Sequence, residues 1–165
     1  AELARRGLLL PTSLPGVIPV VLRALCYSLF KTNHAVGAHV RDAACYVCWA
    51  FARAYDPADL QEYVAAVSQQ LIITAVFDRE VNVRRAAAAA FQECVGRLGT
   101  FPHGIDIIQM ADYFTLSVRA HAFTRIGPKI ADYNAYCGPM MEHLLEHKLG
   151  HWDPEIRGYS SQALA

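Results

Sequence analysis

NVRRAAAAAFQECVGRL, residues 82–98, places five alanines in a row between two arginines and a phenylalanine. At about 100° per residue, six residues share one face of a helix: Val83, Ala87, Ala90, Phe91, Cys94 and Leu98. Arg85 and Ala89 lie on the opposite face. Small side chains let neighbouring helix backbones approach closely. The stretch therefore predicts a helix that is packed among other helices, as in a stack of helix pairs.

A β-branched residue followed by arginine recurs along the chain, each time before small residues: Val40-Arg41, Val83-Arg84, Val118-Arg119 and Ile156-Arg157. The spacings are 43, 35 and 38 residues. Aspartate, which favours helix caps and turns, shortly precedes three of these pairs, as Asp78, Asp112 and Asp153. Asn33 and His34 stand at the corresponding place in the first repeat. A period of about forty residues is typical of HEAT and armadillo helix pairs.

The sequence therefore predicts an all-α fold, a right-handed α-α superhelix of about four HEAT-like helix pairs. We expect one solenoid segment over residues 1–165, taken from a longer solenoid, with repeats at about 14–55, 58–98, 104–133 and 138–165. The expected helices are 14–31, 36–55, 58–77, 81–98, 104–114, 117–133, 138–150 and 153 onward. Pro128 is expected to kink or end its helix, and no sheet is expected because no alternation of period two is sustained.

Composition narrows the function classes. Lys plus Arg equals Asp plus Glu at 15 each, which argues against nucleic acid as the main partner. The five cysteines have no framework spacing and are expected to be reduced thiols in the cytosol. The longest apolar stretch is interrupted by three prolines, so we expect no membrane span.

Two short motifs have both a chemical and a structural interpretation. HLLEH, His143–His147, matches a zinc peptidase pattern, in which Glu146 would be the general base. Its polar residues fall away from the apolar stripe that contains Leu144, so a solvated polar face is favoured and neither metal nor cofactor is expected. The C-x-x-C at Cys45 and Cys48 lies in mid-helix among apolar residues, which favours two small core residues over a redox pair.

The recurrent arginines Arg41, Arg84, Arg119 and Arg157 could form a partner-binding ladder. We favour a structural role, in which each arginine bonds a turn carboxylate or a helix end between repeats. The loop GTFPHGID, residues 99–106, is the candidate for partner contact, because loops carry function more often than cores. Its candidate contact residues are Phe101, His103 and Asp106.

Several stretches together resemble the tubulin-folding cofactor D family: VRDAACYVCWAFARAY at 40–55, AVFDREVNVRRAAAAAFQECVGR at 75–97, GTFPHGIDI at 99–107, ADYF at 111–114 and HWDPEIR at 151–157. The resemblance implies a non-enzymatic cytoplasmic scaffold, associated with the microtubule cytoskeleton, that binds β-tubulin. It also implies assembly of the αβ-tubulin heterodimer and stimulation of tubulin GTP hydrolysis with cofactors C and E, and binding of a small Arf-like GTPase. The alternative is a HEAT scaffold with another client, such as a transport or adaptor complex. The HLLEH motif is the one feature of the sequence that would support an enzymatic function.

Overall fold

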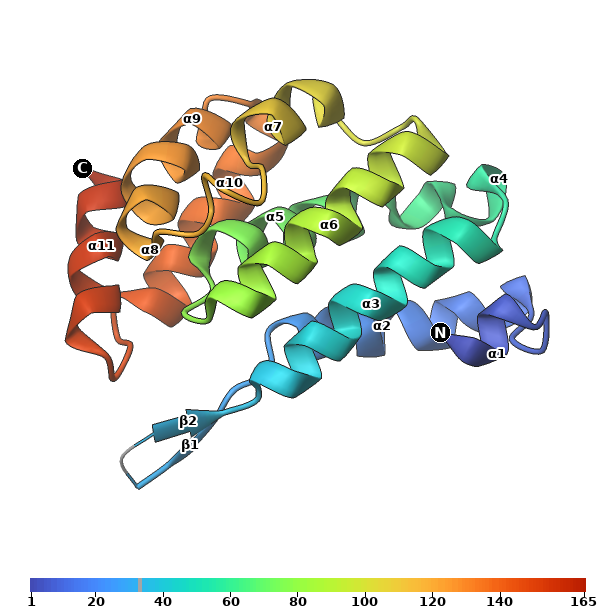
Figure 1. Cartoon of the computed structure of the whole chain (residues 1–165), viewed down its shortest axis with the longest axis horizontal. Helices are drawn as coiled ribbons and strands as arrows, with labels where there is room; N and C mark the ends of the chain where they lie inside the picture. The colour runs from blue at the N-terminus through green and yellow to red at the C-terminus, as the bar shows by residue number, and fades with distance from the viewer. Residues whose placement is uncertain (33) are drawn as a thin grey trace.

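A computed structural model describes residues 1–32 and 34–165, which fold as an all-α solenoid with one short hairpin (Figure 1). Asn33, named above as a departure from the repeat pattern, lies outside the described residues. The longer helices are α2 (Leu14–Leu25), α3 (Ala38–Ala54), α5 (Val64–Phe77), α6 (Val81–Leu98), α10 (Asn134–His143) and α11 (Pro154–Leu164). The shorter helices are α1 (Glu2–Arg5), α4 (Pro57–Leu60), α7 (Gly104–Met110), α8 (Arg119–His121) and α9 (Gly127–Ala131). Pro11–Ser13 and Gln61–Tyr63 form 3-10 turns, and Ala122–Ile126 and Leu144–Lys148 are π-helical.

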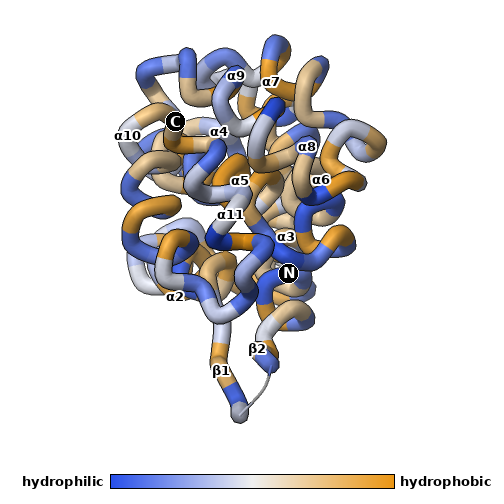
Figure 2. The backbone as a smooth tube through the Cα atoms, turned by 90° about the vertical axis from the view of Figure 1, so that its left-hand side faces the viewer, coloured by the Kyte–Doolittle hydropathy of each residue, from blue (hydrophilic) through white to orange (hydrophobic). Residues whose placement is uncertain are grey.

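The helices form two layers, which Figure 2 shows edge on, with α2 and α10 on one side and α3 and α6 on the other. Helix α5 packs against α2, α6 and α10, and α3 packs against α1, α2 and α6. Seven consecutive side chains at the end of α5 are buried, from Leu71 to Phe77, so this part of the helix is surrounded by others. Within the described ranges, no helix is both long enough and apolar enough to cross a membrane.

Helix α6 has the two faces expected from its alanines. Ala87 is 0% exposed, and Ala90 and Phe91 are also buried, whereas Ala89 faces solvent. Gly99 ends the helix in the left-handed conformation, with φ of 67°, and its backbone N–H bonds the Val95 carbonyl. The small buried residues let α6 lie close to both α3 and α5.

The expected helix 14–31 is wrong after residue 25. Helix α2 ends at Leu25, and an antiparallel hairpin follows, formed by β1 (Leu29–Lys31) and β2 (His34–Val36). Gly37 closes it with φ of 136°, and a Cβ there would lie 2.6 Å from the Tyr27 carbonyl oxygen, so a larger residue does not fit. Strands of three residues are too short for a period-two pattern to be detected in the sequence.

The helix that contains Pro128 does not end at this residue, although such an end was one of the two outcomes expected. The chain stays helical from Arg119 to Ala131, because the π-helical turn Ala122–Ile126 immediately precedes the proline and widens the hydrogen-bonding pattern. The expected helix 104–114 is shorter than predicted, since α7 ends at Met110 and turns follow up to Val118. The helix 119–131 then packs against α5, α10 and α11.

The two faces of α6 predict opposite responses to added bulk. Ala87→Leu inserts a large side chain between packed helices and should lower the free energy of unfolding by about 1–3 kcal/mol. Ala89→Leu adds the same atoms on the solvent side and should change it by less than about 0.5 kcal/mol. Urea denaturation of both variants measures the difference, and similar midpoints would contradict this assignment of faces.

Candidate functional site

Arg84 is the most deeply buried charged residue among those described, at 1% exposed. Its Nη1 donates to the carbonyls of Asp78 and Arg79 at 2.9 and 3.0 Å, in the turn before α6. Its Nε and Nη2 donate to the carbonyls of Leu116 and Ser117 at 2.8 and 2.9 Å, in the loop before α8. Burial lowers its pKa from the ordinary value, yet arginine stays protonated. The side chain therefore ties the turns of two successive repeats together.

Arg41, Arg119 and Arg157 occupy corresponding positions. Arg41 donates through Nη1 to the Tyr27 carbonyl at 2.8 Å and pairs through Nε with Asp78 of the next repeat at 2.5 Å. Arg119 pairs with Asp153 at 3.4 Å and also with Glu155. Arg157 donates to the carbonyls of its own turn, His151 and Trp152. Arg41, Arg84 and Arg119 therefore each contact the turn of the following repeat, whereas Arg157 bonds its own turn.

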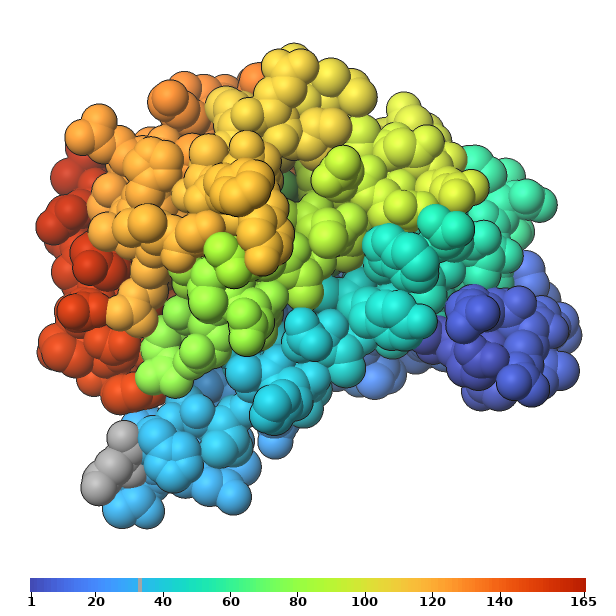
Figure 3. Space-filling view, viewed as in Figure 1, coloured from blue at the N-terminus to red at the C-terminus, as the bar shows by residue number. Residues whose placement is uncertain are grey.

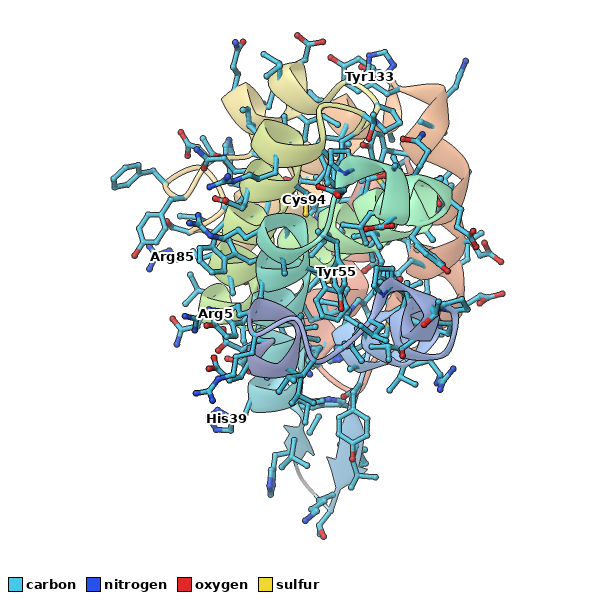
Figure 4. All side chains as sticks on the ribbon, turned by 90° about the vertical axis from the view of Figure 1, so that its right-hand side faces the viewer. Arg5, His39, Tyr55, Arg85, Cys94 and Tyr133 are labelled. Atoms are coloured by element: carbon cyan, nitrogen blue, oxygen red, sulfur yellow. The ribbon has the colours of Figure 1, made fainter. Side chains whose placement is uncertain are left out.

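Bonds between successive repeats connect residues separated by 37 positions for Arg41 and Asp78, and by 40 for Arg53 and Glu93. Such similar separations mean that α3 and α6 run side by side in the same direction. Their outward residues consequently form one continuous surface, which faces the viewer in Figure 3 together with part of the loop 111–118. Figure 4 shows Arg85 projecting from this side, whereas Cys94 lies in the core.

We call this surface the α3–α6 face. It is formed by aromatic and charged side chains on two helices and one loop: Tyr46, Trp49, Arg53, Arg85, Glu93, Arg97, Tyr113 and Phe114. Tyr46 is 50% exposed, Tyr113 53% and Phe114 79%. Tyrosine, tryptophan and arginine are the residue types that most often dominate the energetics of protein interfaces.

The side chains of the α3–α6 face are held by one another. Arg53 lies over the Trp49 ring at 4.7 Å and pairs with Glu93 at 2.9 Å. Arg97 pairs with the same carboxylate at 3.0 Å, and hydrogen bonds from Arg97, then Arg53, lower the pKa of Glu93. Such mutual contacts reduce the entropy lost on binding a partner.

A shallow hollow of about 490 Å³ runs between α3 and α6 on this face. Its floor is open because Ala89 and Gly96 carry little or no side chain, while Trp49 and Arg97 stand at its edge. Near the loop, the Arg85 guanidinium lies 4.0 Å over the Tyr113 ring, beside the exposed Phe114. The hollow and its aromatic rim have the shape and chemistry of a surface for another folded protein.

The loop 99–106 contributes less surface than expected. Phe101 is buried at 6% exposed and packs against Phe91, so it is not part of the surface. His103 adopts a left-handed conformation and stacks on Tyr133, with ring centroids 4.2 Å apart. Asp106 is exposed in the first turn of α7. The loop is also anchored by Tyr136, whose hydroxyl donates to the Pro102 carbonyl at 2.8 Å.

The prediction that the polar residues of HLLEH form a solvated face is wrong in part. His143 points inward and stacks on Phe77, whereas Leu145 is 54% exposed. His143 lies three and seven residues after the buried Met140 and Tyr136, so it shares their inward face. Burial lowers the pKa of His143 to about 2, and the residue is neutral at pH 7. Within the described residues, no group of three or more His, Cys, Asp or Glu side chains is placed to hold a metal ion.

The C-x-x-C thiols lie in the core, as their apolar surroundings suggested. Cys45 and Cys48 are buried in α3, and the Cys94 thiol lies 3.9 Å from the Cys48 carbonyl oxygen. Burial raises the pKa of Cys45 and of Cys94 to about 12. These thiols are therefore protonated at pH 7, which is unfavourable for redox chemistry.

The aromatic part of the α3–α6 face was missed in the sequence, because apolar residues were assigned to the core. Trp49 is half-buried at the rim of the hollow, although it stands among apolar residues in the sequence. Val40 and Ala43, which are also apolar, are exposed. The intervals of 3, 4 and 7 residues between His39, Asp42, Tyr46 and Arg53 could have indicated an outward row on α3.

Substitution of Arg84 should lower the free energy of unfolding far more than substitution of Arg85. Arg84→Met leaves buried carbonyls in two turns without donors and should lower the free energy of unfolding by about 2–4 kcal/mol. Arg85→Met loses a cation–π contact with Tyr113 and one hydrogen bond to Ser117 Oγ, and should cost less than about 1 kcal/mol. Equal urea midpoints for the two variants would rule out Arg84 as a clamp between turns.

His143 should make the protein sensitive to acid. Between pH 6.5 and about 2, the unfolded chain binds a proton at this residue that the folded chain does not, so stability falls as the pH falls through this window. The expected loss between pH 7 and pH 5 is about 2 kcal/mol. His143→Phe keeps an aromatic ring against Phe77 and should remove this part of the loss. Urea titrations at both pH values test it, and an unchanged difference in the variant would contradict the assignment.

Comparison with known proteins agrees with the fold. A family described as "Tubulin-specific chaperone D-like, ARM repeats" matches residues 1–105. Tubulin-specific chaperone D of Dictyostelium discoideum is 43% identical over 99% of this chain, and tubulin-folding cofactor D of Schizosaccharomyces pombe is 28% identical over 99%. The chain spans 11% and 15% of the lengths of these two relatives. No solved structure matches. The chain belongs to the tubulin-specific chaperone D-like family of ARM-repeat proteins.

Proposed function

We propose that this chain is a protein-binding, non-catalytic segment of a tubulin-folding cofactor that binds β-tubulin and helps to assemble the αβ-tubulin heterodimer. The observation that carries the proposal is 43% identity, over nearly the whole chain, to a relative named as a tubulin-specific chaperone. The family match to residues 1–105 supports the same conclusion, because these residues include both helices of the α3–α6 face.

The α3–α6 face supplies the physical basis. Two parallel helices present a hollow about 490 Å³ in volume with aromatic and arginine residues at its rim. Solenoids use extended surfaces of this kind to hold folded proteins. Together with residues 99–106, where His103 and Asp106 remain candidate contacts, this face is the proposed place of contact with β-tubulin.

The remaining partners are proposed from the sequence resemblance. They are the tubulin cofactors C and E, with which the whole protein promotes GTP hydrolysis by tubulin, and a small Arf-like GTPase. We place the protein in the cytoplasm, associated with the microtubule cytoskeleton. We also propose that residues 1–165 are one solenoid segment, with repeats at about 14–55, 58–98, 104–133 and 138–165.

The second candidate is a solenoid scaffold with another client, such as a transport or adaptor complex. The general chemistry of the α3–α6 face is compatible with either client. Identity to named tubulin cofactors favours the first candidate. The two candidate functions are distinguished by the identity of the protein that the full-length chain captures from a lysate.

The test is capture of β-tubulin from lysate by the full-length protein, with variants on the α3–α6 face. Tyr46→Ala and Phe114→Ala, combined, remove two exposed aromatic side chains without touching the core. We expect the affinity for β-tubulin to fall about tenfold or more, as is common when interface aromatic residues are truncated.

Leu145→Ala is the matched control, because Leu145 is similarly exposed but lies on the layer that contains α10. It should bind β-tubulin as the parent does. A protein that retains another client and ignores tubulin would exclude the cofactor function. Unchanged binding by the double variant would exclude only the α3–α6 face, and His103→Ala with Asp106→Asn would then test the loop.

A further inference from the structure

A cleft of about 460 Å³ lies away from the α3–α6 face, at the end of the molecule from which the hairpin projects (Figure 1). Four parts of the chain line it: the end of α2, the hairpin with the start of α3, the end of α5, and the segment after α10. Phe30 of the hairpin meets Trp152 across it, with ring centroids 5.9 Å apart. A volume of this size is typical of sites for small molecules or short segments.

The charges that line the cleft are paired, with one exception. Asp78 accepts from Arg41 at 2.5 and 3.1 Å and from the Glu80 N–H at 2.8 Å, so both of its oxygens are occupied. Arg79 pairs with Glu80. Lys148 forms neither an ion pair nor a hydrogen bond with any described residue. Among the described residues of the cleft, Lys148 is thus the charged side chain without a direct partner. Burial lowers its pKa, and the charge of Asp78 opposes this shift.

Two further donors in the same cleft lack acceptors. Gln70 Nε2 and Trp152 Nε1 are buried atoms without a hydrogen-bond partner among the described residues. Burying such a group costs about 1–3 kcal/mol unless an acceptor meets it. The Trp152 ring is held in place by Arg79, whose guanidinium lies 4.8 Å from the ring centroid. Both donor atoms are themselves shielded from solvent, so a ligand in the cleft meets them only when the neighbouring side chains shift.

The other walls are apolar or uncharged. Leu25, Ile73 and Phe77 line the cleft beside the donors. Burial lowers the pKa of His143 and of His151, which leaves both imidazoles uncharged at pH 7. One positive charge, two neutral donors and an apolar wall match a monoanion with an apolar body. A phosphate group, with a charge of about −1.5 to −2, would be left partly uncompensated.

We propose that this cleft binds a carboxylate attached to an apolar group, with Lys148 as the counter-ion and Gln70 and Trp152 as hydrogen-bond donors. A carboxylate accepts hydrogen bonds on both oxygens and donates none, which fits a site of donors alone. The carboxylate belongs either to a small organic acid or to a glutamate side chain of a protein partner. This site is independent of the proposed tubulin function.

Cys26 lines the cleft and is exposed, so its alkylation reports whether the cleft is filled. The full-length protein is treated with iodoacetamide, and modification of each cysteine is followed by peptide mapping with mass spectrometry. Two matched probe pairs are used: 3-phenylpropionate against 3-phenylpropionamide, and the capped dipeptide acetyl-Phe-Glu-amide against acetyl-Phe-Gln-amide. Cys137, which lies outside the cleft, is the internal control.

A carboxylate probe should slow alkylation of Cys26 to about one third when its concentration is twice its dissociation constant, and should leave Cys137 unchanged. Lys148→Met should abolish this protection, whereas Lys129→Met, a change of an exposed lysine on α9, should preserve it. Lys148→Arg keeps the charge and should retain part of the protection. Slow alkylation of the buried Cys45, Cys48 and Cys94 verifies in the same digest that each variant is folded.

Protection by 3-phenylpropionate supports the site with a small acid as its ligand, and protection by the glutamate dipeptide alone supports a protein side chain. Equal protection by acids and amides, or protection that survives Lys148→Met in a folded protein, would overturn the proposal. The proposal would also be overturned if neither acid protected Cys26. Water alone would then satisfy the donors of the cleft.

Discussion

The buried guanidinium of Arg84 is the constraint on which the stacking of this protein depends. A charge at 1% exposure requires acceptors, and here they are backbone carbonyls from two turns that are more than thirty residues apart. Because these carbonyls belong to the ends of different helix pairs, satisfying the arginine fixes where one pair lies on the next. Arginine suits this position better than lysine, since its planar fork directs several N–H groups at once.

The same arrangement explains why one face of the solenoid is free for binding. Arg41 and Arg119 also reach the turn of the following repeat, so the alignment of the helices is set at their ends. Between the ends, small buried residues such as Ala87 allow close packing of α3, α5 and α6. The outward side chains of α3 and α6 add only partly exposed contacts, such as the Arg53–Glu93 pair, to this arrangement. Exposed aromatic residues there, such as Tyr46, are best explained by a partner.

Much of this fold could be predicted from the sequence, and each wrong prediction has a local cause. The period of about forty residues, the Val-Arg pairs and the alanine-rich face of α6 identified an all-α solenoid, because each reflects contacts that recur between neighbouring helices. The hairpin after Leu25 escaped detection because strands of three residues carry no measurable period. The inward position of His143 was missed because the apolar Leu145, which is exposed, was counted on the buried stripe in its place. The α3–α6 face was missed because exposed and buried aromatic residues look alike in one sequence.

The α3–α6 face and the cleft differ in how they depend on the stacking of helices. The face belongs mainly to two adjacent parallel helices, so it survives small changes in the curvature of the solenoid. The cleft is built from segments as distant as Leu25 and Trp152, and a change in curvature moves its walls relative to one another. A ligand that bridges Lys148, Gln70 and Trp152 therefore favours the curvature seen here. The size of this effect equals the difference between the free energies with which the ligand binds this form and a more open form. Such a ligand would act on the shape of the scaffold without touching the α3–α6 face.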